Sequence, residues 1–431
     1  MGNLLWIKQG RILDPHTNRD QVGDLFVKED SIVASLTDQE KAEATILEAT
    51  GKWVLPGLID LQVHFREPGQ SHKETIASGS RAAAAGGFTT VVNMGNTNPS
   101  IDSPNTVRFI RDKIETDAVI EIISAACSTK DRNGSVLAPI GSLAKAGIRV
   151  LADNEKCIQN ASVMQRVAEY SEMFDLLLLV HCQDYTLTGG EKGSPMREGE
   201  CSLRLGMRGW PRSAEETIVA RNCIIARDTG VRMHFQHITS ANSLEFIQQA
   251  RSQGVAISVE VSPHHLTLLD REVRSFDSNY KMNPPLCGRE DQEALWKAIK
   301  NGWIDAIASG HAPHQDYEKE VEFDKAPYGI VGLETLLPLC CQAWQERGLP
   351  LLDLVSLLTI KPAKVLQIER GTLEVGALAN VIIFDPEEKW IFNQKNTQSL
   401  SCNSPWLGKE MTGKVQTTVF RGKVVFLQDN F

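Results

Sequence analysis

The stretch VLPGLIDLQVHF, residues 54–65, is an apolar run of strand length that ends in polar residues. Seven further runs of this kind follow, and helix-like segments such as ASVMQRVAEYSEMF fill the gaps between them. The predicted strands cover residues 54–65, 89–94, 118–126, 148–153, 176–183, 231–238, 256–266 and 305–310. Apolar strands separated by helices indicate a parallel sheet covered on both faces. Eight such units predict an α/β fold, a closed (β/α)8 barrel of the TIM type.

Short strand-like runs dominate the two ends of the chain. LLWIKQGRIL and GDLFVKEDSIVASL lie near the N-terminus, and ANVIIFD and TTVFRGKVVF lie near the C-terminus. Glycine, aspartate and asparagine interrupt these runs at close intervals, as is typical of antiparallel strands. We therefore predict a small β-sandwich domain formed by residues 1–53 and 367–431, with the barrel between them at residues 54–366.

Composition excludes several classes of function. The chain has 431 residues and a net charge of −9, which does not favour binding to nucleic acid or to an anionic membrane. No apolar run approaches the ~18 residues of a membrane span, and the N-terminal run is too short for a signal peptide. The nine cysteines show no C-x-x-C spacing, which favours reduced thiols. We expect a soluble, cytoplasmic protein.

Polar residues follow most of the predicted strands at the end where a barrel builds its active site. They are His64, Arg66, Asn96, Asn98, Asp153, His181, His237, His311 and His314. A single histidine at a strand end is more often structural, but several imidazoles and a carboxylate on one barrel face indicate chemistry. Imidazole and carboxylate ligands suit Zn²⁺ or a similar ion, which activates water or polarises a carbonyl.

The adjacent pair His264-His265 in the seventh predicted strand differs from this set. Neighbouring residues on a strand point to opposite faces of the sheet. At most one of the two can therefore face the mouth of the barrel, and we expect a structural role for the pair.

Three long segments resemble the dihydroorotase family of the amidohydrolase superfamily. They are PGLIDLQVHFREPGQSHKETIASGSRAAAAGGFTTVVNMGNTNPSID (56–102), MNPPLCGREDQEALWKAIKNGWIDAIASGHAPH (282–314) and GIVGLETLLPL (329–339). The resemblance implies a metal-bearing (β/α)8 barrel with a flanking sandwich. It also implies the reversible closure of carbamoyl aspartate to dihydroorotate in pyrimidine biosynthesis.

The resemblance assigns roles to particular residues. His64, Asp153, His181 and His237 match metal ligands of the family, with Asp153 in the place of a carboxylated lysine found elsewhere. Arg66, Asn96 and His314 match groups that bind the carboxylate of the substrate. Asn283 matches a residue that contacts the pyrimidine ring.

The chain also departs from the family pattern at one metal position. Gln62 replaces the first histidine of His-x-His, and in IASGHAPH (307–314) Gly310 replaces an aspartate that is both a metal ligand and the proton carrier. Three lesser changes are Gly95 for a proline, Asn154 for the second residue of Asp-Asp-Gly, and Gln183 for the glutamate of His-Ala-Glu-Asp. At the second metal position the ligands Asp153, His181 and His237 are retained.

These departures predict a non-catalytic protein, because nothing at Gly310 can carry a proton and positioned acid–base catalysis is worth about 10²–10⁴-fold. We expect at most one Zn²⁺ ion. Non-catalytic relatives imply a structural role as an oligomeric partner of aspartate carbamoyltransferase. Two alternatives stay open. In the first, the protein is an active zinc-dependent dihydroorotase or other cyclic amidohydrolase that uses the single remaining metal site. In the second, it is a binding module for a carboxylate such as dihydroorotate.

Overall fold

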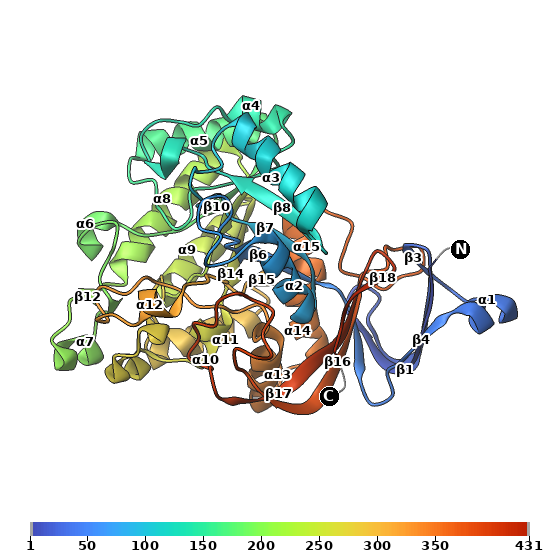
Figure 1. Cartoon of the computed structure of the whole chain (residues 1–431). Helices are drawn as coiled ribbons and strands as arrows, with labels where there is room; N and C mark the ends of the chain where they lie inside the picture. Colours follow the sequence, from blue (N-terminus) through green and yellow to red (C-terminus); the bar gives the residue numbers. More distant parts are fainter. Residues whose placement is uncertain (1–2, 429–431) are drawn as a thin grey trace.

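The computed structural model describes residues 3–428. It consists of a barrel and, at its side, a separate sheet that contains the first and the last strands of the chain (Figure 1).

Eight parallel strands form the wall of the barrel, and neighbours in sequence are neighbours in the sheet. They are β6 (Leu58–Val63), β7 (Phe88–Asn93), β8 (Glu121–Ala126), β9 (Val150–Ala152), β10 (Leu177–Val180), β13 (Met233–Phe235), β14 (Ile257–Val261) and β15 (Ala306–Ile307). A parallel bridge between Val63 and His311 joins the first strand to the segment after the last, and the amide of His64 donates to the carbonyl of His311 at 2.9 Å. The predicted (β/α)8 barrel is confirmed.

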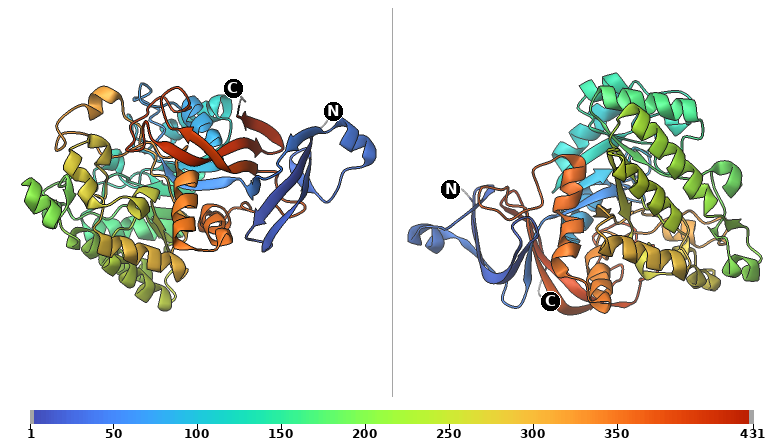
Figure 2. Two further views of the ribbon diagram at one scale, coloured as in Figure 1. Left: turned by 90° about the horizontal axis from the view of Figure 1, so that it is seen from below. Right: turned by 180° about the vertical axis from the view of Figure 1, so that it is seen from behind.

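Helices cover the outside of the barrel (Figure 2). They are α2 (Ile76–Ala85), α3 (Pro104–Asp117), α4 (Ile140–Lys145), α5 (Ala161–Met173), α8 (Ser213–Thr229), α9 (Ala241–Ser252), α11 (Arg289–Lys300), α13 (Leu336–Arg347), α14 (Leu351–Leu358) and α15 (Ile360–Leu366). Short elements interrupt the connecting loops: η1 (Lys130–Arg132), α6 (Tyr185–Thr188), β11 (Met196–Arg197), α7 (Glu200–Leu205), β12 (Gly209–Trp210), α10 (Pro263–Thr267), η2 (Asp270–Ser275), η3 (Ser278–Tyr280) and α12 (Asp316–Lys319).

Both chain ends contribute to the second sheet, as predicted, and we call it the terminal sheet. It contains β1 (Leu4–Asp14), β2 (Arg19–Lys28), β3 (Ser31–Val33), β4 (Thr45–Glu48), β5 (Trp53–Pro56), β16 (Val381–Ile391), β17 (Glu410–Phe420) and β18 (Lys423–Leu427), with helix α1 (Asp38–Glu43) beside it. The order is β18-β17-β16-β5-β1-β2-β3, and β4 pairs with β1. Ile7, Val27 and Val381 belong to its own apolar core. The side chain of Asp14 accepts from the amide of Leu373 at 2.9 Å, which ties the N-terminal strand to the C-terminal segment.

The predicted strand at residues 54–65 is divided between the two sheets. Strand β5 ends at Pro56 and pairs with β16 of the terminal sheet, whereas β6 begins at Leu58 in the barrel. Gly57 lies between them, and a Cβ atom there would collide with the side chain of Thr89. The close approach of β7 therefore requires glycine at the point where the chain passes from one sheet to the other.

The seventh predicted strand, residues 256–266, was too long. Strand β14 ends at Val261, and Pro263 begins the short helix α10, which carries His264 and His265. Proline is well suited to the first turn of a helix because its missing N–H would have no partner there.

Within the described chain, no helix combines the length and the apolar character that a membrane crossing requires.

Candidate functional site

A small cavity lies at the mouth of the barrel, where the carboxyl ends of the strands meet. Its volume is about 30 Å³, which is room for one or two water molecules, whereas ligand pockets typically span about 300–1,000 Å³. Residues of its wall are Gln62, His64, Asn154, Glu155, His181, His237, Ser262, His264, Met282, Asn283, Gly310, Ala312, Tyr328, Gly329 and Ile330. The mouth is therefore nearly filled by the protein's own side chains.

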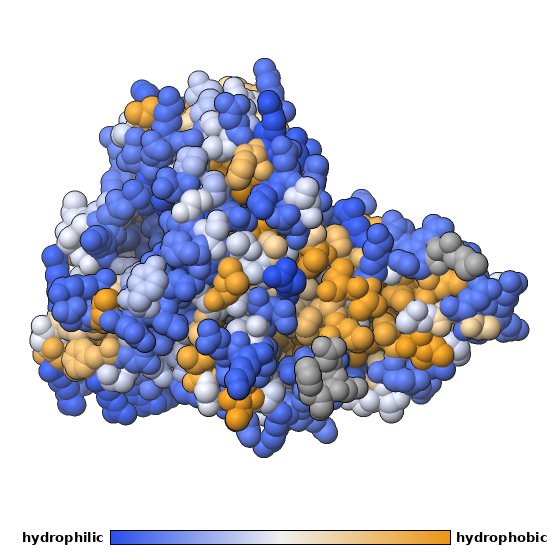
Figure 3. Space-filling view, viewed as in Figure 1, coloured by the Kyte–Doolittle hydropathy of each residue, from blue (hydrophilic) through white to orange (hydrophobic). Residues whose placement is uncertain are grey.

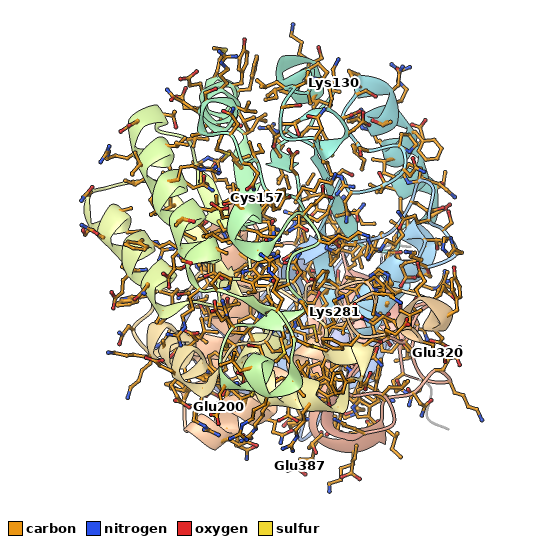
Figure 4. All side chains as sticks on the ribbon, turned by 90° about the vertical axis from the view of Figure 1, so that its left-hand side faces the viewer. Lys130, Cys157, Glu200, Lys281, Glu320 and Glu387 are labelled. Carbon is orange, nitrogen blue, oxygen red and sulfur yellow. The ribbon has the colours of Figure 1, made fainter. Side chains whose placement is uncertain are left out.

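The loop after β15 helps to close this mouth. Lys281 lies near the middle of the view in Figure 4, and its ammonium group donates to the carbonyls of Asp324 at 2.8 Å and Ala326 at 2.7 Å. Lys319, within the loop, donates to the carbonyl of Gly329 at 3.1 Å. The Lys281 contacts tie residues 324–326 to the segment before Met282, and the Lys319 contact ties the loop to itself.

The predicted metal ligands come together only in part. His64, His181 and His237 line the cavity, and Asp153 precedes the wall residue Asn154 in the chain. The ring centroids of His181 and His237 are 5.0 Å apart. Burial lowers the pKa of both, so both imidazoles are neutral at pH 7. His64 is held by a 2.9 Å contact between its Nδ1 atom and the side-chain oxygen of Asn96.

The carboxylate of Asp153 is engaged by the chain itself. Its Oδ1 atom accepts from the amides of Ser128 at 2.7 Å and Thr129 at 3.1 Å, and its Oδ2 atom accepts from the hydroxyl of Thr129 at 2.5 Å. Burial nevertheless raises the pKa of Asp153 above its ordinary value, against the effect of these hydrogen bonds.

His181 is also held by a protein contact. Its Nε2 atom lies 3.2 Å from the Oε1 atom of Gln183, and the amide of Gln183 is oriented by donating to the hydroxyl of Thr188 at 3.0 Å. Because the oxygen of Gln183 faces the ring, the Nε2 atom of His181 carries the proton and donates. Within residues 3–428 the Nδ1 atoms of His181 and His237 have no hydrogen-bond partner.

This arrangement does not fit the zinc ion that the resemblance implies. Zinc sites have three or four protein ligands, but across residues 3–428 no group of three or more His, Cys, Asp or Glu side chains is placed to hold a metal ion. The Nδ1 atoms of His181 and His237 and the Nε2 atom of His64 are not engaged by hydrogen bonds within the described residues, but they do not converge on one point, and both oxygens of Asp153 already accept hydrogen bonds.

We expect purified protein to contain at most one metal ion per chain, weakly held, because only a partial ligand set faces the cavity. Elemental analysis of protein prepared without chelator measures this content. Substitution His181→Ala should remove whatever metal is present. Two tightly bound ions per chain would contradict the expectation.

Of the three residues predicted to bind a carboxylate, Arg66 and His314 lie together, whereas Asn96 contacts His64. Arg66 is buried, donates from Nε to the carbonyl of Pro313 at 3.3 Å, and lies 3.3 Å from the Nε2 atom of His314. Burial lowers the pKa of His314 to about 4, so its ring is neutral. No carboxylate within the described residues forms an ion pair with Arg66. A buried guanidinium without an anionic partner is costly, which favours a place for an anion here.

Glu155 is a residue of the cavity that the sequence prediction missed. It is half-buried and lines the cavity beside Asn154. Burial works to raise the pKa of Glu155, but the neighbouring His64 and Arg66 hold it below its ordinary value. The signal in the sequence was an acidic residue where the pattern Asp-Asp-Gly has glycine.

The remaining predicted residues differ in whether they line the cavity. Asn283 lines the cavity, and its side-chain oxygen has no hydrogen-bond partner among the described residues. His311 does not line the cavity; its Nδ1 atom accepts from the amide of Gly332 at 3.2 Å, and its Nε2 atom lies 3.4 Å from the carboxylate of Glu74. Of the pair expected to be structural, His264 lines the cavity and the Nε2 atom of His265 lies 3.0 Å from the carbonyl of Pro284. One of the two therefore faces the mouth.

The barrel, the terminal sheet and the histidine-lined mouth together define an amidohydrolase-type protein. Solved structures with this fold include the L-hydantoinase (dihydropyrimidinase) of Arthrobacter aurescens, with a TM-score of 0.87, 22% identity and coverage of 100% of this chain and 97% of that chain. Dihydropyrimidinase from Brevibacillus agri NCHU1002 is similar with a TM-score of 0.83, 22% identity and coverage of 98% and 95%. At these identities the likeness concerns the fold alone.

Sequence relatives are more specific. The family model described as dihydro-orotase-like matches residues 51–243. The dihydroorotase of Geobacter sp. (strain M21) is 42% identical over 426 residues, covering 98% of this chain and 99% of the relative. The dihydroorotase of Endomicrobium trichonymphae is 40% identical over 425 residues, with the same coverage. The chain belongs to the dihydroorotase family.

Proposed function

We propose that this chain is a dihydroorotase-like protein of pyrimidine biosynthesis that does not catalyse the reaction of its family. The observation that carries the proposal is Gly310 on the wall of the cavity, at the position where the family pattern has the proton-carrying aspartate. The small volume of the cavity and the incomplete ligand set support the same conclusion, because a reaction site needs room for its substrate and groups that stabilise charge.

We further propose a structural role toward aspartate carbamoyltransferase, which makes the carbamoyl aspartate that the family consumes. A chain released from all selection would lose its packing, yet the barrel wall and the core of the terminal sheet are both intact here. A folded body without a working site is best explained by contacts that it makes with another protein.

A candidate surface for this contact lies on the terminal sheet. Figure 3 shows a hydrophobic area over the part of the molecule where β3 and β18 lie. Among the apolar side chains of this part of the molecule, Val375 and Val424 are exposed by 61% and 38%. The segments that carry these side chains are joined through Ala379. The amide of Ala379 donates to the carbonyl of Asp30 at 2.7 Å, and its carbonyl accepts from the amide of Gly422 at 3.0 Å. Large exposed apolar patches commonly mark protein interfaces.

Mixing the purified protein with aspartate carbamoyltransferase from the same organism should give one complex of fixed stoichiometry at micromolar concentration. A stable contact buries at least about 1,000 Å² in total, so the double variant Val375→Glu with Val424→Glu should weaken the complex at least about tenfold. Light scattering measures the mass of the complex.

Met173→Glu is the matched control, because Met173 is also exposed (65%) but lies on α5, at the end of a barrel helix. This variant should assemble like the unchanged protein. Two unshifted peaks in the mixture, with transferase activity unchanged, would contradict the scaffold proposal.

One observation favours a second candidate function, an active cyclic amide hydrolase. Glu155 brings a carboxylate to the cavity whose wall includes Gly310, and a carboxylate is a competent proton carrier. If Glu155 had that role, the protein would turn over dihydroorotate and Glu155→Gln would abolish the rate. The non-catalytic proposal expects no rate in either protein.

A further inference from the structure

We propose that a cleft at the amino-terminal face of the barrel binds a phosphate-bearing ligand of the nucleoside phosphate class. Glu121, Val150 and Leu177, which begin strands β8, β9 and β10, all line this amino-terminal cleft, so it lies at the opposite end of the strands from the mouth. Its volume is about 510 Å³, within the range of about 300–1,000 Å³ that is typical of ligand pockets. The proposal does not depend on what happens at the mouth.

The cleft exists because the barrel wall has a gap between β8 and β9. Strand β8 pairs with β7 from Glu121 to Ser124, but its register with β9 begins only at Ala125, opposite Val150. The first four residues of β8 therefore have a neighbouring strand on one side only. Ile123 and Ser124 are half-buried and line the cleft, whereas the strands of a parallel sheet are normally covered. Helix α3 and the end of α15 border the gap (Figure 1).

Three arginines give the cleft its charge. Arg111 on α3, Arg149 directly before β9 and Arg232 directly before β13 all line it. Arg232 is paired with Asp175 at 3.1 Å. Arg111 and Arg149 form no ion pair within residues 3–428, so two guanidinium groups of one cleft have no anionic partner in the protein.

The two carboxylates of the wall do not neutralise these arginines. Asp175 is engaged by Arg232. Glu121 has two partners that lie outside the wall, because its carboxylate is 3.3 Å from the guanidinium of Arg370 and 3.6 Å from that of Arg421. The cleft therefore keeps an excess of positive charge, which a bound anion would balance.

The turn after α4 holds the guanidinium of Arg111 in place. Its Nη2 atom donates to the carbonyl of Ala146. Gly147 follows with φ of +96°, and a Cβ atom there would lie only 3.0 Å from the same nitrogen. The turn thus leaves space for the guanidinium, whose remaining N–H groups can donate to a ligand.

The chemistry of the wall indicates the class of ligand. Guanidinium groups bind phosphate through paired N–H donors, and two unpaired arginines match the charge of about −2 that a phosphate monoester carries. Ile114, Leu366 and Ile368 line the same cleft and are half-buried, so they offer apolar contact to a flat ring. A nucleoside monophosphate uses both features, whereas inorganic phosphate uses only the charge.

Titration calorimetry of the full chain with uridine monophosphate and adenosine monophosphate tests the proposal. We expect saturable binding with a Kd of about 1 mM or tighter, and binding at least about tenfold weaker for inorganic phosphate and for adenosine. Arg111→Gln and Arg149→Gln should each weaken nucleotide binding at least about tenfold, because each removes a charge-assisted hydrogen bond. Ile114→Glu should abolish binding, because it places a negative charge in the wall.

Arg108→Gln is the matched control. Arg108 is an exposed arginine of the same helix that does not line the cleft, so this variant should bind nucleotides like the unchanged protein. Circular dichroism verifies that each variant is folded.

An absence of saturable binding by both nucleotides at millimolar concentration would overturn the proposal. Nucleotide binding that is unchanged in both Arg111→Gln and Arg149→Gln, or that falls equally in Arg108→Gln, would also overturn it. Inorganic phosphate that binds as tightly as the nucleotides would show an adventitious ion only, and would refute the nucleoside phosphate class.

Discussion

Purified protein is expected to interconvert carbamoyl aspartate and dihydroorotate no faster than the uncatalysed reaction. Gly310 offers no group that moves a proton, and positioned acid–base catalysis is typically worth about 10²–10⁴-fold. The incomplete ligand set removes the charge stabilisation that a metal supplies. A chromatographic assay run in both directions, on protein of known metal content, measures the rate.

A robust rate that survives repurification and is abolished by Asp153→Ala would contradict this expectation.

The most informative variant is Gln62→His combined with Gly310→Asp. Gly310 has φ of +61°, a region that aspartate tolerates better than most residues. A Cβ atom there would lie 3.6 Å from His264, an ordinary contact distance.

The double variant should therefore fold, and its rate should rise above that of the unchanged protein by a small factor at most, because the mouth remains small. Asn154 and Gln183 still differ from the family pattern, and Glu155 still borders the cavity, so the recovered rate should remain far below that of an intact family member. Addition of Glu155→Gly should raise it further, because this change removes a side chain from the wall of the cavity.

Stability should fall as the pH decreases from 6.5 to 4, by less than the three buried histidines alone would give. Burial lowers the pKa values of His64, His265 and His314 to about 4. Between these pH values the unfolded chain binds protons that the folded chain does not, so stability is lost as the pH falls. Each such histidine contributes about 3 kcal/mol over this interval. Asp60 and Glu334 oppose the trend, because burial raises their pKa values to about 7.

His265→Gln isolates one contribution to this acid sensitivity. His265 is buried in α10, and glutamine can keep the contact with the carbonyl of Pro284. The variant should lose less stability than the unchanged protein between pH 6.5 and 4, by up to about 3 kcal/mol. Denaturant unfolding at several pH values measures the slopes.

The difference in the free energy of unfolding between the two proteins at pH 7.5 serves as the reference, since at that pH it reports the packing cost of the substitution alone. Parallel slopes for the two proteins between pH 6.5 and 4 would show that His265 does not bind a proton on unfolding in this range, and would contradict the prediction.

The sequence by itself determined the architecture and most of the site. Strand and helix periods are local properties, so apolar runs such as LLLLVHCQ predict buried parallel strands without knowledge of their neighbours. Because the carboxyl ends of all barrel strands meet at one face, the positions of His64, His181 and His237 along the chain were sufficient to bring them to one cavity. The replacement of the family's aspartate by Gly310 could also be recognised from the sequence alone.

Only the tertiary structure decided how these groups are used. The division of residues 54–65 at Gly57 depends on Thr89 from the next strand. The contact of Gln183 with His181 and the engagement of Asp153 by Thr129 depend on hydrogen bonds that have no sequence pattern. Glu155 borders the cavity because the turn at Asn154 is anchored by Gln236, 82 residues away in the chain. Local periodicity sets which face a residue belongs to, but the partner of each side chain is chosen by long-range packing.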